Sequence, residues 1–310
     1  MTYFADLATG VVLAIVGGWL VPLAGMSLLV PALRDSRLKV ANYRGAEVFL
    51  GLGLVWVFWV AGVRIFGPAG ATSFVVIDGG ISSAAGAVAV AAAALTVTWA
   101  LLFGLIDDVF GTSGDKGFKG HFTSLARGRL STGALKAFGI GLVALAAGAQ
   151  IASRRELLGV EYAVVLICSA AMIALCANLV NLLDLRPGRA IKGYGVLCVA
   201  GACALAFPLG GEVLLTVAST LIALVWLLGP VIAVARWDFG EEGMLGDAGA
   251  NAAGALAGFV LAFALSTGAL VVATIILLAL NALSERVSYS RLIESNSMLS
   301  RIDLWGRQSR

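Results

Sequence analysis

Residues 84–106 read AAGAVAVAAAALTVTWALLFGLI, an apolar run without a charged side chain, and Asp107 and Asp108 follow it directly. A helix needs about 20 apolar residues to cross the hydrocarbon layer of a bilayer. The chain of 310 residues is 60% hydrophobic and only 13% charged, whereas a soluble domain carries about 25% charged residues. The run is therefore predicted to span a membrane.

Similar runs recur along the chain and predict an all-α, polytopic transmembrane bundle of about nine spans. The predicted spans cover residues 10–33, 47–66, 84–106, 133–151, 159–180, 191–209, 212–235, 249–266 and 267–284. Gly254 and Gly258 have the small-xxx-small spacing that permits close helix packing. We expect residues 1–310 to form a single integral membrane domain.

The distribution of Lys and Arg predicts which helix ends face the cytoplasm, because cytoplasmic loops carry an excess of these residues. Of the 21 in this chain, all but Arg64, Arg154 and Arg155 fall after odd-numbered predicted spans. The N-terminus is therefore expected outside. The predicted cytoplasmic segments are residues 34–46, 107–132, 181–190, 236–248 and the tail 285–310, each approximate.

Polar and acidic residues gather at three of these predicted cytoplasmic helix ends: Asp107 and Asp108; Asn178, Asn181 and Asp184; and Asp247 within Gly246-Asp-Ala-Gly249. Carboxylates at the end of a lipid-spanning helix are costly unless they are solvated, paired or bound to a metal. A single such cluster is equally consistent with a water-exposed anchor. Three clusters on one side, close to many cations, predict a site for phosphate and for Mg²⁺, with Mn²⁺ as a substitute.

The basic residues supply candidate phosphate contacts. The segment from Gly114 to Lys136 is rich in glycine and cations, and within it we favour Lys119 and His121 as substrate contacts. Attraction of this segment to anionic lipid headgroups is the alternative reading. Arg44, before the second predicted span, is a further substrate-binding candidate, although loop anchoring explains it equally well.

The order and spacing of these motifs resemble the polyprenyl-phosphate N-acetylhexosamine-1-phosphate transferases, glycosyltransferase family 4. That family includes the phospho-MurNAc-pentapeptide translocase and the undecaprenyl-phosphate GlcNAc-1-phosphate transferases. Its aspartate pair matches Asp107 and Asp108, and its Asn-x-x-Asn-x-x-Asp element matches Asn178, Asn181 and Asp184. Its Met-Gly-Asp-x-Gly element matches Leu245-Gly-Asp247-Ala-Gly249.

The chain also departs from the family pattern. Pro187 replaces the second acid of the family's Asp-Gly-x-Asp-Gly element, and Ala250 replaces the serine expected after Gly-Asp-x-Gly. The family's histidine-rich loop is absent, because His121 is the only histidine. A remodelled donor pocket is expected, with the following as phosphate or sugar contacts: Arg186, Arg189, Arg291 and Asn296.

The resemblance implies Mg²⁺-dependent transfer of a sugar-1-phosphate from a UDP-sugar to undecaprenyl or decaprenyl phosphate, with release of UMP. It implies Asp247 as the leading Mg²⁺ ligand, Asp107 as a second ligand or shaper of the metal shell, and Asp108 as the group that orients or deprotonates the acceptor phosphate. The roles of Asp107 and Asp108 are interchangeable at this stage, because adjacent carboxylates titrate as a coupled unit. Asn178, Asn181 and Asp184 would lie near the nucleotide or the metal. The expected setting is envelope glycan synthesis (peptidoglycan or teichoic acid) in the bacterial inner (plasma) membrane, by a homodimer with a cytoplasmic active site and no nucleic-acid partner.

Two other functions fit parts of the sequence. A catalytically lapsed relative that acts as an envelope-assembly scaffold is favoured by Pro187 and by the missing histidines. An ion-coupled transporter would also carry membrane carboxylates, but transporters place them near the bilayer midplane. The acids of this chain are predicted at helix ends instead.

Overall fold

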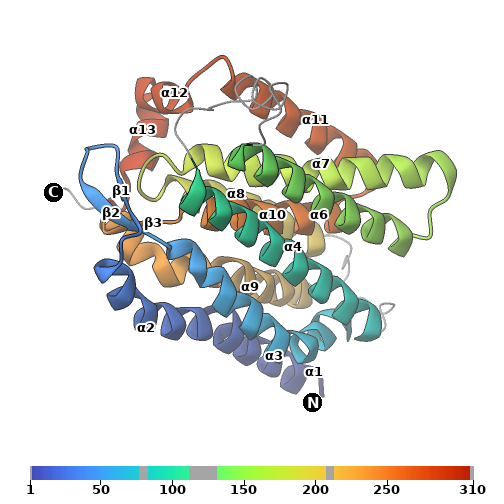
Figure 1. Ribbon diagram of the computed structural model, residues 1–310. Coiled ribbons are helices and arrows are strands. Elements are labelled where there is room, and N and C mark those ends of the chain that lie inside the picture. The colour runs from blue at the N-terminus through green and yellow to red at the C-terminus, as the bar shows by residue number, and fades with distance from the viewer. Residues whose placement is uncertain (1, 77–82, 112–130, 207–212, 308–310) are drawn as a thin grey trace.

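The computed structural model describes residues 2–76, 83–111, 131–206 and 213–307. Helices dominate these ranges, and most of them lie side by side as a bundle (Figure 1). Within the described ranges, eight helical segments are long and apolar enough to cross a membrane. The all-α, multi-pass class is therefore confirmed at this level, whereas the number of spans and their orientation remain predictions.

The helices follow the apolar runs, and each of the nine predicted ranges overlaps one helical segment. The first is continuous and consists of α1 (Thr2–Leu13), the π-helix η1 (Ala14–Leu20) and α2 (Val21–Asp35). The other long helices are α3 (Val55–Val76), α4 (Ser83–Phe110), α6 (Thr132–Arg154), α7 (Gly159–Leu183), α8 (Arg189–Ala206), α9 (Val213–Phe239), α10 (Gly246–Ala264) and α11 (Thr267–Ser284).

A small sheet stands where a helix start was predicted. Strand β1 (Lys39–Ala41) pairs antiparallel with β2 (Glu47–Leu50), and β2 pairs in parallel with β3 (Gly243–Met244). The prediction that a span begins at residue 47 is therefore wrong. Helical structure begins only at the 3-10 helix η2 (Leu52–Leu54), and α3 then runs ten residues beyond the predicted end at residue 66. Arg64, which was assigned to the outer side, lies within α3 and not in a loop.

The turn between β1 and β2 explains this difference. The Asn42 side-chain oxygen accepts hydrogen bonds from the backbone N–H groups of Arg44 and Ala46. Gly45 has a φ of +78°, the left-handed region that glycine adopts without strain. This local turn chemistry reverses the chain and sends Glu47–Leu50 back along β1, although the residues are apolar enough for a span.

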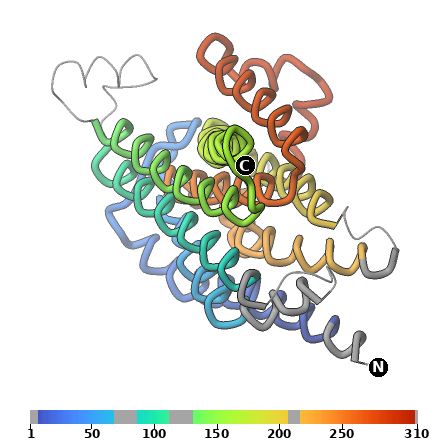
Figure 2. Tube along the Cα trace, turned by 90° about the vertical axis from the view of Figure 1, so that its right-hand side faces the viewer, coloured from blue at the N-terminus to red at the C-terminus, as the bar shows by residue number. Residues whose placement is uncertain are grey.

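Helix α10 forms the centre of the bundle and packs against α4, α7 and α8 (Figure 2). A Cβ atom added to Gly254 would lie 2.2 Å from the Cys176 carbonyl oxygen of α7, so the helix backbones touch there. One added to Gly104 of α4 would lie 2.5 Å from the Asp247 carbonyl oxygen. The close packing predicted from Gly254 and Gly258 is confirmed, and the second contact brings the end of α4 to the start of α10.

The C-terminal tail forms two short helices, α12 (Tyr289–Ser295) and α13 (Ser297–Leu304). They lie at the end of the bundle that carries the sheet (Figure 1). The Asn296 side chain caps α13 by accepting the backbone N–H groups of Met298 and Leu299.

Candidate functional site

A lysine and two aspartates from three helices meet at the sheet end of the bundle. Asp107 lies in the last turn of α4, Asp247 in the first turn of α10, and Lys136 one turn into α6. The Lys136 ammonium donates to Asp107 Oδ2 at 2.6 Å and also to Asp247 Oδ2. All three side chains are largely shielded from solvent. One cationic atom thus bridges two carboxylates that are 140 residues apart in sequence.

Asp108 has a different set of partners. Its two carboxylate oxygens accept the backbone N–H groups of Asp247 and Ala248, each at 2.9 Å. The first N–H groups of a helix have no partner within the helix, and a carboxylate there also interacts favourably with the helix dipole. Asp108 of α4 therefore caps α10 and fixes the residue that carries the Asp247 carboxylate. This geometry favours a positioning role for Asp108 over the predicted contact with an acceptor phosphate.

Asp184, directly after α7, is the third acid of the predicted motif set and is only 8% exposed. Burial is the main reason that its pKa is raised well above the ordinary value. The charge of Asp238, and to a smaller degree those of Asp247 and Asp108, raise it further, while the Gly246 N–H opposes the change. Burial of Asp184 therefore disfavours its charged form relative to a solvent-exposed aspartate.

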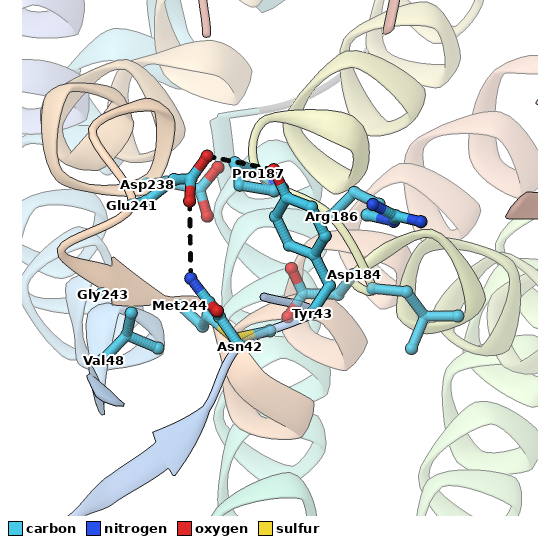
Figure 3. A pocket seen from close by; sticks show the side chains of 11 residues that line it. Asn42, Tyr43, Val48, Asp184, Arg186, Pro187, Asp238, Glu241, Gly243 and Met244 are labelled. Carbon is cyan, nitrogen blue, oxygen red and sulfur yellow. Dashed lines mark hydrogen bonds between the residues drawn. The ribbon is translucent and has the colours of Figure 1, made fainter. Parts of the chain in front are cut away.

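Asp184 lines a small hollow at this end of the bundle. Glu241 lies at its wall, where it accepts hydrogen bonds from Tyr43 Oη at 3.1 Å and from Asn42 Nδ2 at 3.4 Å (Figure 3). The Arg186 guanidinium stacks over the Tyr43 ring, 4.2 Å from its centroid. The lining residues are Asn42, Tyr43, Val48, Asp184, Leu185, Arg186, Pro187, Asp238, Glu241, Gly243 and Met244.

Several predicted substrate contacts are engaged elsewhere in this structure. Asn178 donates to Asn281 of α11 at 2.7 Å, and Arg189 is buried in an ion pair with Asp303 of the tail. Asn181 is half-buried on the last turns of α7, and its carbonyl oxygen accepts the Asp184 N–H.

The remaining predicted contacts lie at the surface or outside the described residues. Arg44 is exposed and forms an ion pair with Glu241, while Arg291 and Asn296 are exposed on the tail. Lys119 and His121 lie outside the described residues. Of the predicted set, the structure therefore brings together Asp107, Asp108, Asp184 and Asp247, with Arg186 at the adjoining hollow.

Two charged residues of this region were not singled out by the motifs. Lys136 was one cation among many in the basic segment, and Asp238 belonged to no motif. Asp238 is 3% exposed and accepts the Gly188 N–H at 2.5 Å, so it braces the turn after Asp184. Its position near the end of an apolar run could have indicated a role, because a carboxylate in the last turn of a helix interacts unfavourably with the helix dipole and therefore needs a partner outside that helix.

The capacity of these residues to hold a metal can be judged from their arrangement. Within the described ranges, no group of three or more His, Cys, Asp or Glu side chains is arranged to hold a metal ion. Two carboxylates nevertheless converge on the single Lys136 ammonium, a position that a divalent cation could take in place of the ammonium. Because Mg²⁺ is commonly bound by one or two carboxylates with water and substrate phosphate completing its shell, Asp107 and Asp247 fit such an ion.

Comparison with known proteins adds no identification. The sequence matches no protein-family model and no curated protein sequence.

Proposed function

We propose that this chain is a membrane-embedded phosphotransferase that moves a sugar-1-phosphate from a nucleotide sugar to a polyprenyl phosphate. The observation that carries the proposal is the convergence of Asp107 and Asp247 on Lys136, with Asp108 capping α10 and Asp184 buried in the adjoining hollow. These acids come from three separate stretches of sequence. Phosphoryl transfer relies on positioning and charge neutralisation, which such a cluster can provide.

Asp107 and Asp247 are the residues that would hold Mg²⁺. When bound, the ion would neutralise phosphate charge between donor and acceptor. Lys136 already contacts both carboxylates, and its flexible side chain can turn its ammonium to a phosphate oxygen as the two carboxylates take a new partner. Asp108 keeps the start of α10 in place during this exchange.

The proposed reaction balances without a further reagent. An oxygen of the polyprenyl phosphate attacks the β-phosphorus of the UDP-sugar, and a new phosphorus–oxygen bond forms. The bond between the β-phosphorus and the bridging oxygen breaks, and that oxygen leaves with UMP. The Tyr43 ring and the Arg186 guanidinium, which line the hollow beside Asp184, would offer stacking and phosphate contacts to the donor nucleotide.

The setting of the reaction belongs to the same proposal. The apolar helices support a lipid environment, in which a polyprenyl chain can lie against the bundle while its phosphate reaches the helix ends. We propose that this end faces the cytoplasm of a bacterial inner membrane, where nucleotide sugars are made, and that the product initiates an envelope glycan. The proposed working form is a homodimer.

One observation favours a second function. Lys136 neutralises Asp107 and Asp247 within the chain itself, as a purely structural ion-pair cluster would. A lapsed transferase that serves as a scaffold would keep this cluster and need no metal. A transporter is less well supported, because Asp107, Asp108 and Asp247 lie in terminal turns of their helices rather than at mid-helix.

The deciding experiment measures nucleotide release. The purified full-length protein is mixed with polyprenyl phosphate, Mg²⁺ and a panel of nucleotide sugars, and released nucleoside monophosphate is quantified. Asp247→Asn should abolish release. Asp35→Asn, the same change at the exposed end of α2, should leave it intact. Release that survives either Asp247→Asn or removal of Mg²⁺ refutes the metal role, and no release from any donor favours the scaffold.

A further inference from the structure

The turn between α7 and α8 forms one wall of the hollow, and the C-terminal tail is bonded to it. Arg186 and Pro187 of this turn line the hollow (Figure 3). Arg307 of the tail donates to the Pro187 carbonyl oxygen at 3.0 Å. Arg186 donates through Nη2 to Glu294 Oε1 of α12, at 2.7 Å. Two adjacent residues of the wall are therefore held by the tail.

The rest of the tail is fixed independently of the Glu294 contact. Arg189 of α8 donates to both oxygens of Asp303 in α13, at 2.9 and 2.8 Å, and to Ser290 Oγ of α12 at 2.8 Å. The Arg189 and Asp303 side chains are only 5% and 8% exposed, and their two parallel hydrogen bonds fix one relative orientation. These contacts keep α12 beside the turn whether or not Glu294 keeps its partner.

The ion pair between Arg186 and Glu294 is of a different kind, because water reaches it. The two side chains are 26% and 50% exposed. An exposed ion pair contributes little to stability, so a better anion can replace Glu294. Arg186 also has a second support, since its guanidinium lies 4.2 Å from the centroid of the Tyr43 ring. Glu294 is therefore not needed to keep Arg186 at the wall of the hollow.

Arg186 is the group that an anion in the hollow would need. Among the described residues that line the hollow, it is the only lysine or arginine, whereas Asp184, Asp238 and Glu241 are acids. A guanidinium binds carboxylate and phosphate through the same planar set of N–H donors. The Glu294 carboxylate thus occupies a position at Arg186 that a phosphate oxygen could take.

We propose that Glu294 is the resident counter-ion of Arg186, and that a phosphate of the donor nucleotide displaces it when the donor binds. This inference rests on the proposed function, because the ligand is the nucleotide sugar named there. Glu294 then lowers the affinity of the hollow for the donor. Because coupling between two sites is reciprocal, a donor that displaces Glu294 also loosens α12.

The first test measures nucleotide binding. Purified full-length protein in detergent is titrated with UDP in the presence of Mg²⁺, and the dissociation constant is obtained by calorimetry. Glu294→Gln removes the charge and keeps the size of the side chain, and it should tighten binding by about two- to fivefold, the range expected for an exposed ion pair. Glu285→Gln is the matched control, because it makes the same change at an exposed acid at the start of the tail and should leave binding unchanged.

Two further measurements separate a counter-ion from a merely structural contact. Arg186→Gln should weaken UDP binding, and adding Glu294→Gln to it should give no gain, because both changes act on one contact. Hydrogen exchange of residues 289–295 should become faster when the native protein is saturated with UDP. A structural ion pair with no part in binding would not respond to UDP.

Nucleotide release is measured on the same samples, so that this inference and the proposed reaction can fail separately. Equal or weaker UDP binding by Glu294→Gln, with release intact, would overturn the counter-ion role and leave the transfer standing. Tighter binding by this variant, with no release from any donor, would support the counter-ion role and refute the transfer. Absence of UDP binding by every variant would refute the hollow as a donor site, and the role of Glu294 with it.

Discussion

Asp108→Asn is expected to destabilise the bundle, because the substitution removes one of two hydrogen bonds at the start of α10. The native carboxylate accepts one N–H with each oxygen, from Asp247 and Ala248, both at 2.9 Å. Asparagine has one acceptor oxygen, and its NH₂ group cannot accept the second N–H. A buried donor left without a partner costs about 1–3 kcal/mol, and loss of a helix N-cap costs a similar amount, about 0.5–2 kcal/mol.

The assay is thermal unfolding of the purified protein in detergent. For a chain of this size class, about 1 kcal/mol corresponds to roughly 2–4 °C in Tm, so a cost of about 1–3 kcal/mol should lower Tm by about 2–12 °C. Asp35→Asn is the matched control, because it makes the same chemical change at an exposed helix end and should change stability by less than about 0.5 kcal/mol.

An Asp108→Asn variant with the same Tm as the native protein would contradict the capping role of Asp108. If that stable variant also released no nucleotide, Asp108 would be assigned to the acceptor phosphate rather than to the cap. A variant that is less stable but keeps partial activity with an unchanged metal requirement would instead match the positioning role that the structure favours.

Three further predictions follow from other contacts. Lys136→Met leaves Asp107 and Asp247 without their shared cation, so it should lower the free energy of unfolding by about 3–5 kcal/mol when no metal is present. Added Mg²⁺ should raise the Tm of this variant, and it should no longer do so when Asp247 is also changed to Asn. Asp303 has a lowered pKa: burial raises it, but hydrogen bonds and charges from Arg189 and Arg307 outweigh burial. The ion pairs of Asp303 should therefore stabilise the contact between the tail and the bundle fully at pH values above 3.8, the ordinary pKa of an aspartate. This stabilisation should be lost as the pH falls below 3.8 toward the lowered pKa of the folded state, and hydrogen exchange of residues 297–304 should become faster. Gly254→Val forces side-chain atoms against the Cys176 carbonyl oxygen and should lower the free energy of unfolding by at least about 1–3 kcal/mol, which would be measured as a lower yield of folded protein. Gly141→Ala should be tolerated, because nothing lies within 4 Å of the added Cβ atom.

The helices could be predicted from sequence because lipid solvation imposes long apolar runs that are easy to recognise. The strand Glu47–Leu50 could not, because its residues are as apolar as those of a span. What decides its structure is the hydrogen bonding of the Asn42 turn and the pairing with β3, which lies about 200 residues later in the sequence. Pairing between distant segments leaves no local periodicity to read.

The acids of the candidate site could also be predicted, since Asp107, Asp108, Asp184 and Asp247 all interrupt or border apolar runs. Their partners could not. Lys136 differs from Lys116 and Arg127 in lying inside the predicted span 133–151, which was an available signal. Its two aspartate partners, however, meet it only when α6 packs beside α4 and α10. Arg189 also has a partner that the sequence does not reveal: its place in a basic segment suggested a phosphate contact, and in the structure it is paired with Asp303 of the tail.

Three aspartates of this region share one electrostatic feature, which is their position in the last turn of a helix. Asp107 and Asp108 lie in the last turn of α4 and Asp238 in the last turn of α9, positions at which the dipole of the residue's own helix disfavours a negative charge. Each of the three is satisfied from outside its helix: by the Lys136 ammonium, by the N–H groups that begin α10, and by the Gly188 N–H. The stabilising partners exist only after α6, α8 and α10 have packed. In this chain the shielded carboxylates at these helix ends are therefore satisfied by the residues that begin or precede neighbouring helices, and those residues surround the proposed site, whereas the exposed Asp35 at the end of α2 is left to solvent.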